Sequence, residues 1–165
     1  MDDALATEIH RAEGPEVEAA RDLTNRSWLA TYSPLIGEDT TREIIADRHS
    51  SQRFAEQAGR VQDRFLVAVE NGSVVGHLYA FAKDGMYVDR LHVEPALKGR
   101  GIGAALLAHL EQQLFSDTRC WLDVLSGNDA AMQFYERVGY AKVGETDACG
   151  GLAGIPAIIF EKKIH

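Results

Sequence analysis

Residues 91–107 read LHVEPALKGRGIGAALL and are the most informative part of the chain. An apolar strand pattern stops at Pro95, a basic glycine-rich loop follows, and an amphipathic helix pattern begins at once. Gly99, Gly101 and Gly103 have no Cβ atom, so the backbone can adopt positive φ and bring several N–H groups to one anion. The start of the helix adds unpaired N–H groups and a partial positive charge. The stretch therefore predicts a phosphate cradle.

Lys98 and Arg100 place two cations beside this cradle, which favours a polyphosphate ligand. The chain has no G-x-x-x-x-G-K-[ST] motif, which argues against ATP or GTP. Residues 99–104 do match the alanine-ended dinucleotide fingerprint, but that motif belongs at the first strand of a doubly wound sheet. Here about 90 residues precede the motif and about 60 follow, which leaves no room for the remaining βαβ units. A nicotinamide-dependent oxidoreductase is therefore a distant alternative.

A second segment separates the remaining alternatives. Residues 128–140 read NDAAMQFYERVGY and follow the apolar run CWLDVL at 120–125. Together with the loop at 98–103, this segment resembles the GNAT superfamily of acyl-CoA-dependent N-acetyltransferases. The family's loop is Gln/Arg-x-x-Gly-x-Gly/Ala, and the sequence here departs from it only at Lys98. The family's later motif is Asn-x-x-Ala-x-x-Phe-Tyr-x-x-x-Gly-Phe/Tyr, and every fixed position of it is matched by Asn128, Ala131, Phe134, Tyr135, Gly139 and Tyr140.

The resemblance implies a fold and an activity. The fold would be a mixed α/β structure in which a mainly antiparallel sheet of six to seven strands is flanked by helices. A splayed strand pair would form the acyl-CoA cleft. Residues 1–165 would make a single domain that uses acetyl-CoA as cosubstrate and moves acetyl to a primary amine of a small molecule or peptide. The alternative function is a non-catalytic acyl-CoA-binding sensor on the same fold. Because dimers are common in such families, a homodimer is also compatible with this assignment.

The resemblance also implies roles for particular residues. The loop would hold the pyrophosphate, the main chain of residues 91–93 would pair with pantetheine and polarise the thioester carbonyl, and Asn128 would contact the pantetheine arm. The Tyr135 hydroxyl would protonate the departing thiolate. The cofactor-binding set is then Leu91, His92, Val93, Lys98, Gly99, Arg100, Gly101, Ile102, Gly103, Ala104, Asn128, Ala131 and Tyr135.

The spacing of Asn128 and Tyr135 suits one extended ligand. Seven residues on a helix place them about 20° apart in direction and roughly 10 Å apart along the axis. Each residue has an ordinary structural alternative as well. Asn128 is a good N-cap, and Tyr135 could be a half-buried phenol whose hydroxyl bonds to backbone.

The general base is less clearly indicated. Amine acetylation needs a group that removes a proton. Asp89 stands where several family members place an acidic base, but it could equally pair with Arg90 or Arg119. His92 is the next candidate, although a turn at residues 84–85 would set it opposite His77 as a structural imidazole pair.

The acceptor side is expected in residues 28–36 and in a flexible loop at 147–154. Trp28 and Tyr32 are four residues apart and could share one helical face. They would form either an aromatic wall for the acceptor or a packing contact between helices. Trp28 leans towards the core, and Tyr32 is the better candidate for the substrate pocket.

Whole-chain properties fit this assignment. The net charge of −8 and the absence of a broad basic stripe argue against nucleic acid and mildly favour a cationic acceptor. The N-terminus, MDDA, carries two aspartates and no apolar core, and no apolar run approaches the ~18 residues of a membrane span. We therefore expect neither signal peptide nor membrane segment and a cytoplasmic protein. No metal site is expected from the spacing of His, Cys, Asp and Glu. The histidines at 10, 49, 109 and 165 are expected at the surface.

Periodicity and turn signals predict the order of elements. Asn71-Gly72 and Asp84-Gly85 are hairpin turns. Strands are expected at 5–11, 64–70, 73–82, 86–93, 119–124, 140–145 and 155–161, and helices at 15–29, 41–58, 101–115 and 128–138.

Overall fold

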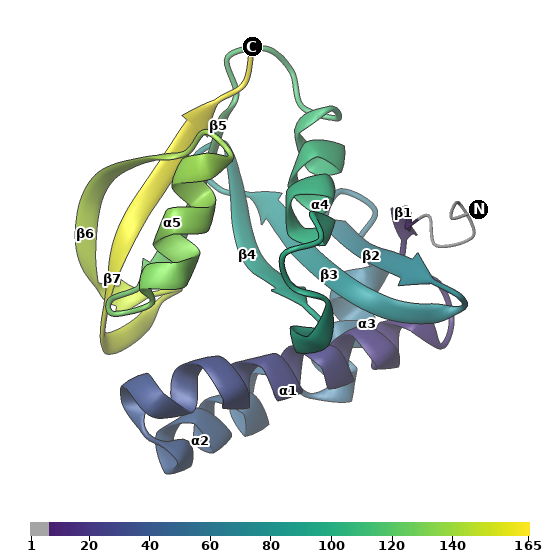
Figure 1. Cartoon of the computed structure of the whole chain (residues 1–165), viewed down its shortest axis with the longest axis horizontal. Coiled ribbons are helices and arrows are strands. Elements are labelled where there is room, and N and C mark those ends of the chain that lie inside the picture. Colours follow the sequence, from purple (N-terminus) through teal and green to yellow (C-terminus); the bar gives the residue numbers. More distant parts are fainter. Residues whose placement is uncertain (1–6) are drawn as a thin grey trace. The chain divides into compact units, whose positions relative to one another are not determined.

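A sheet of seven strands, flanked by helices, organises the chain in the computed structural model, which describes residues 7–165 (Figure 1). The strands hydrogen-bond in the order β1-β2-β3-β4-β5-β7-β6. Strands β4 and β5 pair in parallel, while β1–β2, β5–β7 and β6–β7 are antiparallel. The expectation of a mixed, mainly antiparallel sheet is confirmed. The strands are β1 (Glu8–Arg11), β2 (Arg64–Glu70), β3 (Ser73–Ala82), β4 (Met86–Val93), β5 (Arg119–Leu125), β6 (Ala141–Cys149) and β7 (Leu152–Lys163).

Five α-helices and one short 3₁₀ segment accompany the sheet within residues 7–165. They are α1 (Glu16–Ile36), α2 (Glu38–Arg48), α3 (Ser51–Gly59), the 3₁₀ turn η2 (Pro95–Leu97), α4 (Ile102–Glu111) and α5 (Asp129–Arg137). The chain divides into two compact units. The first comprises residues 1–79 and 90–110, and the second comprises residues 80–89 and 111–165.

The two predicted hairpin turns are present. Asn71 and Gly72 have φ of 50° and 77°, and Asp84 and Gly85 have φ of 49° and 108°. Positive φ at both central residues is the geometry of a type I′ turn, which matches the twist of paired strands. The turn chemistry of these two dipeptides therefore accounts for the end of β2, for both ends of β3 and for the start of β4.

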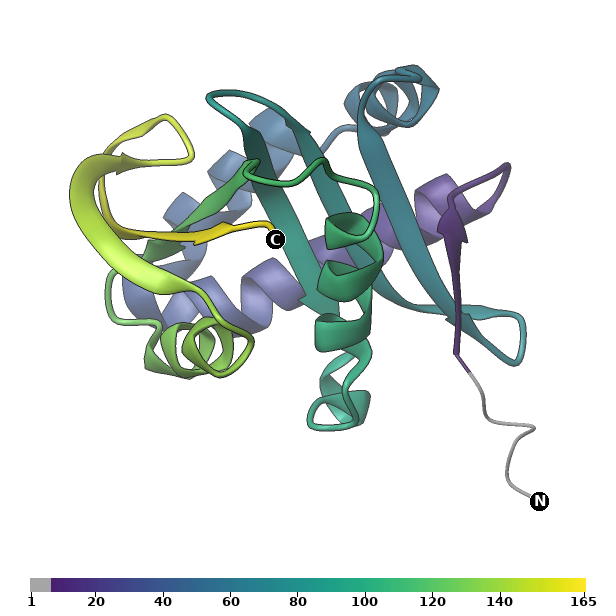
Figure 2. The ribbon, with the colours of Figure 1, turned by 90° about the horizontal axis from the view of Figure 1, so that it is seen from above.

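Several expectations about the elements are wrong, and the helix expected at 101–115 ends already at Glu111. The first helix does not stop at residue 29, because α1 runs through Pro34 in its last turn and ends at Ile36. The N–H of the C-cap residue Gly37 donates to the Ser33 carbonyl. The helix expected at 41–58 is two helices, with a break at His49 and Ser50, where the Ser50 side chain caps α3. The loop expected at 147–154 is a hairpin instead, since β6 and β7 continue almost to its tip (Figure 2). Residues 5–6 of the expected first strand lie outside the described residues.

In the first unit, β3 has helices on both of its faces. A Cβ on Gly76 would lie 2.9 Å from Ile102 Cγ2 and 3.0 Å from Leu106 Cδ1, so only glycine lets α4 pack this closely. The next residue, His77, points to the opposite face, where its ring lies 4.5 Å from Phe65 and 6.0 Å from Phe54 of α3. Successive side chains of a strand alternate between faces, so α4 and α3 cover opposite sides of this sheet segment.

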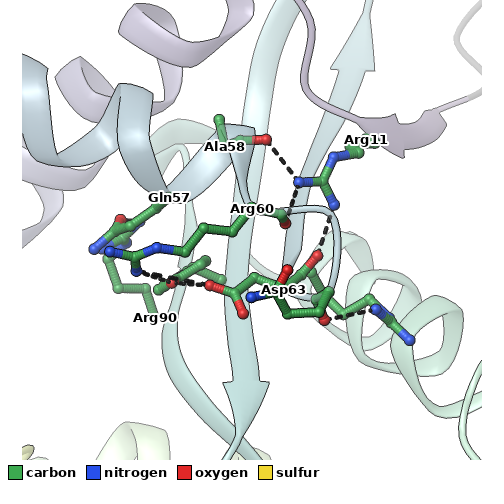
Figure 3. A network of polar contacts seen from close by, with 9 residues as sticks. Arg11, Gln57, Ala58, Arg60, Asp63 and Arg90 are labelled. Carbon is green, nitrogen blue, oxygen red and sulfur yellow. Dashed lines mark hydrogen bonds and ion pairs between the residues drawn. The ribbon is translucent and has the colours of Figure 1, made fainter.

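Arg11 of β1 closes the C-terminal end of α3. Its guanidinium donates to the carbonyls of Ala58, Arg60 and Asp63 at 2.6, 2.8 and 2.6 Å (Figure 3). The last carbonyls of a helix have no partner within the helix, so a cation placed here satisfies them and suits the helix dipole. The same corner is tied to β3, because the Tyr79 hydroxyl donates to the Asp63 carboxylate at 2.5 Å. Burial and this carboxylate raise the pKa of Tyr79 to about 12.

Three buried histidines surround Arg90 in this unit. His49, expected at the surface, is only 4% exposed, and its Nδ1 lies 3.0 Å from Asn25 Oδ1. The bond from Glu94 N–H to the Val75 carbonyl sets a register that puts His92 opposite His77, as expected. Burial, and then the charge of Arg90, lower the pKa of all three imidazoles. For His49 and His92 the pKa falls to about 3.

These histidines predict a loss of stability in mild acid. An unfolded histidine has a pKa of about 6.5, so between pH 6.5 and 3 the unfolded chain binds more protons than the folded one. The free energy of unfolding should therefore fall as the pH drops through this window. Thermal melts at pH 7 and pH 5 would show a melting temperature lower by several degrees at pH 5, and His49→Gln should reduce that difference. Equal melting temperatures at the two pH values would contradict the prediction.

The second unit is built on β5 and β7, which pair over seven residues from Arg119↔Lys163 to Leu125↔Ala157. Tyr140 connects α5 to this sheet, because it follows the helix closely and its hydroxyl contacts β5. Its hydroxyl donates to Glu111 Oε2 at 2.8 Å and contacts Cys120 Sγ at 3.2 Å, and burial raises its pKa strongly. Lys162 completes the corner by donating to Glu111 and to the Val138 carbonyl.

Candidate active site

The predicted cradle forms at the start of α4. Gly99 and Gly101 both have φ of 86°, a conformation that only glycine adopts without strain. The first helical hydrogen bond runs from Ala105 N–H to the Gly101 carbonyl at 2.9 Å. The N–H groups of Ile102 and of the next two residues therefore precede the hydrogen-bonded ladder of the helix and have no acceptor within it. The helix start thus leaves N–H donors without an intrahelical acceptor, directly after the two glycines of positive φ.

The cradle is open where an anion would have to approach. Within the described part of the chain, a Cβ added to Gly99 or Gly101 would meet no atom within 4 Å. Ile102 and Gly103, by contrast, are buried and fix the first turn of α4. The loop is therefore held in place by the buried first turn of α4 and is accessible to solvent at Gly99 and Gly101. This accessibility would allow a phosphate group to bind.

The two cations of the cradle differ. Lys98 is exposed, whereas Arg100 is held by Glu70 at the end of β2, with Nη1 to Oε1 at 3.2 Å and Nη2 to Oε2 at 3.0 Å. Thr7 Oγ1 also donates to Glu70 Oε2, at 2.6 Å. The Thr7 hydrogen bond and then Arg100 lower the pKa of Glu70. Glu70 was not expected from the sequence, because 30 residues separate it from Arg100.

The end of β4 is fastened to α1. Ser27 Oγ and His92 Nδ1 are 2.9 Å apart, and Arg26 pairs with Glu94 at 2.9 and 3.0 Å. His92 is 9% exposed. With a pKa of about 3 it is neutral near pH 7 but is a poor proton acceptor, which argues against the alternative that it is the general base. Leu91 and Val93 are half-buried, so their side chains pack while their main chain lies at the strand end.

Trp28 and Tyr32 share one face of α1, as their spacing predicts. Their ring centroids are 4.5 Å apart with an edge-to-face angle of 75°. His49 packs against Trp28 at 5.0 Å. Both aromatic residues are half-buried, so the pair forms a packing contact and also presents aromatic surface.

On the second unit, α5 carries the later motif. Asn128 is its N-cap, because Oδ1 accepts the N–H of Ala131 at 3.3 Å. Tyr135 is half-buried, and its ring lies 5.8 Å from Tyr140 and 6.4 Å from Phe160. The structural role expected for Asn128 is therefore present, and it leaves the amide N–H₂ group of that side chain for other partners.

A pair of carboxylates lies where β4 and β5 stop pairing. The recorded ladder joins only Met86↔Cys120 and Tyr87↔Trp121, and the rings of Tyr87 and Trp121 contact at 4.6 Å on one face. Asp89 and Asp123 are each two residues further on, so both point to that same face. Burial, then Asp89 and then Asp123 raise the pKa of Tyr87, so both charges lie near its phenol.

Asp123 is a further residue that the sequence argument missed. Its Oδ2 accepts the Tyr87 hydroxyl at 3.1 Å and the Gly150 N–H at 3.0 Å, which ties the β6–β7 turn to β5. Its Oδ1 is buried and has no hydrogen-bond partner among residues 7–165. The clue in the sequence that could have identified Asp123 is that it is the one charged residue inside the apolar run CWLDVL at 120–125. Of the two arginines considered as partners of Asp89, Arg119 binds Glu161 at 2.6 Å, and Arg90 donates to Gln57 and His77.

Two classes of site find no support in the described chain. Within residues 7–165, no three His, Cys, Asp or Glu side chains are grouped so that they could hold a metal ion. In the same residues, no helix combines the length and the apolar character needed to cross a membrane.

Comparison with known proteins gives consistent matches. The family model described as "Acetyltransferase (GNAT) family" matches residues 18–140. Acetyltransferase ECA0875 from Pectobacterium atrosepticum is 37% identical over 86 residues, which cover 49% of this chain and 60% of that protein. The chain thus matches less than two thirds of this curated relative.

Solved structures share the fold. The PaiA N-acetyltransferase of Thermoplasma acidophilum in complex with coenzyme A superposes with a TM-score of 0.81 at 22% identity, covering 96% of this chain and 99% of that one. The ribosomal-protein-S18-alanine N-acetyltransferase of Escherichia coli gives a TM-score of 0.67 at 22% identity, covering 96% and 94%.

Proposed function

Because the chain belongs to the acetyltransferase (GNAT) family, we propose that it transfers an acetyl group from acetyl-CoA to the primary amine of a small molecule or peptide. The observation that carries the proposal is the open glycine cradle at the start of α4. Coenzyme A has a pyrophosphate that such a helix start would bind. The main chain of residues 91–93 and the Asn128 side chain are the proposed contacts of its pantetheine arm.

The reaction needs one proton removed and one supplied. The amine nitrogen forms a bond to the acetyl carbonyl carbon, the carbon–sulfur bond breaks, the nitrogen loses a proton and the thiolate gains one. We assign the first task to Asp89 and the second to the Tyr135 hydroxyl. Both side chains belong to the second unit, and Asp89 shares its face of the sheet with Asp123. The N–H groups at the end of β4 are proposed to stabilise the carbonyl oxygen as its charge develops.

The acceptor is proposed to be an amine that is cationic in solution. Supporting this are the net charge of −8 and the two carboxylates at the end of the β4–β5 ladder. Trp28 and Tyr32 of α1 are the proposed aromatic contacts of the acceptor. A panel of amines, assayed by release of free thiol from acetyl-CoA, tests the proposal. Thiol release with none of the amines, from a protein that still binds CoA, would favour the non-catalytic acyl-CoA sensor.

The cradle assignment predicts the effect of Gly101→Asp. The carboxylate would block N–H donors and repel the pyrophosphate, so the Kd for CoA should rise on the order of 30-fold. Thermal melts with and without CoA measure this, because bound ligand stabilises the folded state by RT ln(1 + [L]/Kd). Gly37→Asp is the matched control. Gly37 also has positive φ and open space at its Cβ, but it lies between α1 and α2.

Both variants should lose stability without ligand, by roughly 1–2 kcal/mol, since a side chain is strained at this φ. Only Gly101→Asp should lose the stabilisation by CoA. If folded Gly101→Asp protein were still stabilised as strongly as the unmodified protein, the phosphate assignment would be wrong.

A further inference from the structure

Glu70 is a buried carboxylate that lies outside every motif of the sequence. Its side chain is only 7% exposed, whereas that of Arg100 is 42% exposed. Within the described part of the chain, its two oxygens accept three hydrogen bonds, one from Thr7 and two from the Arg100 guanidinium. The arrangement is that of a fixed acceptor with a more accessible cation bound to it.

Arg100 would have to leave this carboxylate to grip a phosphate with both of its terminal nitrogens. Among residues 7–165, Glu70 would then keep a single hydrogen bond, the one from Thr7. A buried charge that loses its partner is strongly destabilising, so the pair favours staying intact. The N–H groups of the cradle need no such rearrangement, because the positive φ of Gly99 and Gly101 and the start of α4 already place them together.

We propose that Glu70 is a positioning residue for acyl-CoA: it holds Arg100, and through it the loop at residues 98–101, in the shape that presents the cradle N–H groups to the pyrophosphate. Arg100 stays paired with Glu70 when CoA binds. The pair is neutral as a whole, so the net charge that the cradle offers comes from Lys98 and the helix start. This inference rests on the proposed function, because it concerns the same ligand.

Glu70→Gln tests the inference. The amide keeps the size of the side chain but cannot accept both guanidinium nitrogens as a carboxylate does. The Kd for CoA, measured by titration calorimetry, should rise about tenfold. Glu38→Gln is the matched control, because it makes the same chemical change at an exposed ion pair, Glu38 with Arg42 on α2. It should leave the Kd unchanged.

Two further measurements separate positioning from a general loss of structure. S-acetylpantetheine has the thioester but lacks the pyrophosphate, so Glu70→Gln should lower kcat/KM with acetyl-CoA and leave the value with S-acetylpantetheine unchanged. In an Arg100→Gln background, Glu70→Gln should cause no additional loss, because Glu70 acts through Arg100. Equal losses with both thioesters, or additive losses in the double variant, would overturn the inference.

The opposite model, in which Glu70 competes with phosphate for Arg100, predicts tighter CoA binding by Glu70→Gln. Tighter or unchanged binding therefore refutes the inference. If Glu70→Gln does not fold, Arg100→Lys decides instead. A lysine keeps the charge but cannot form the paired contact, so its CoA affinity should fall nearly as far as that of Arg100→Gln, and retained affinity would refute the inference. Failure of the unmodified protein to bind CoA would contradict the proposed function, whereas binding that Glu70→Gln leaves unchanged contradicts only this inference.

Discussion

Tyr135→Phe is expected to lower kcat on the order of 10²-fold while the Kd for acetyl-CoA changes by less than about tenfold. The substitution removes one oxygen and little volume, and the ring would keep its contacts with Tyr140 and Phe160. If the hydroxyl protonates the departing thiolate, its loss affects the chemical step and not the binding of the cosubstrate. Steady-state kinetics with a saturating amine, together with CoA titration, measure both quantities.

Tyr140→Phe is the matched control for this prediction. Tyr140 is a buried tyrosine of the same unit, with its hydroxyl bonded to Glu111 and Cys120. Its loss should cost about 1 kcal/mol of stability, from the missing hydrogen bond, and leave kcat nearly unchanged. If Tyr135→Phe behaved like Tyr140→Phe, with a lower melting temperature and intact turnover, the acid role would be wrong. Solvent or the newly formed ammonium would then supply the proton.

Asp89→Asn should also lower kcat, by roughly 10²-fold or more, and should flatten the acid limb of the pH–rate profile. An amide cannot accept a proton in this pH range, so only amine molecules that are already neutral would react. The loss should therefore shrink as the pH rises towards the pKa of the acceptor. Rates measured across the pH range with one good acceptor test this.

Two other aspartates make the result interpretable. Asp129→Asn removes an exposed carboxylate in the first turn of α5 and should leave the profile unchanged. Asp123→Asn changes the other carboxylate on the same face as Asp89, the one bonded to Tyr87 and Gly150. If Asp123→Asn flattens the acid limb and Asp89→Asn does not, the base is Asp123. If neither variant alters the profile, a water molecule removes the proton or the amine binds in its neutral form.

The parts of the fold that were predictable are those that a short stretch of backbone dictates. Asn71 and Gly72 form a turn because both residue types tolerate the positive φ that the turn requires. The loop before α4 likewise depends on positive φ at Gly99 and Gly101. Asn128 caps α5 through its own side chain and the N–H of Ala131, a contact within one turn. Such local interactions leave a signature in residue type and spacing.

The parts that were not predictable depend on neighbours distant in the sequence. The first helix was expected to end at residue 29, yet α1 continues to Ile36 with Pro34 in its last turn, so the proline disturbs only the end of the helix. His49 is a polar residue and was expected at the surface, but the rings of Trp28 and Phe54 pack against it. Arg100 with Glu70, and Asp123 with Gly150, are separated by 30 and 27 residues, so no local pattern identifies them as partners.

The position of Arg90 bears on how β4 finds its correct pairing during folding. Arg90 is 4% exposed and its guanidinium lies 4.0 Å from the Phe54 ring, whereas the preceding Asp89 is exposed. A slip of β4 by one residue would reverse every side chain. The guanidinium would leave the Gln57 acceptor and the aromatic rings, and the Asp89 carboxylate would enter the same apolar surroundings. Folding intermediates in which β4 is shifted by one residue would therefore be short-lived. Residues 91–93, which follow Arg90, would then reach the observed register without a competing shifted register of β4.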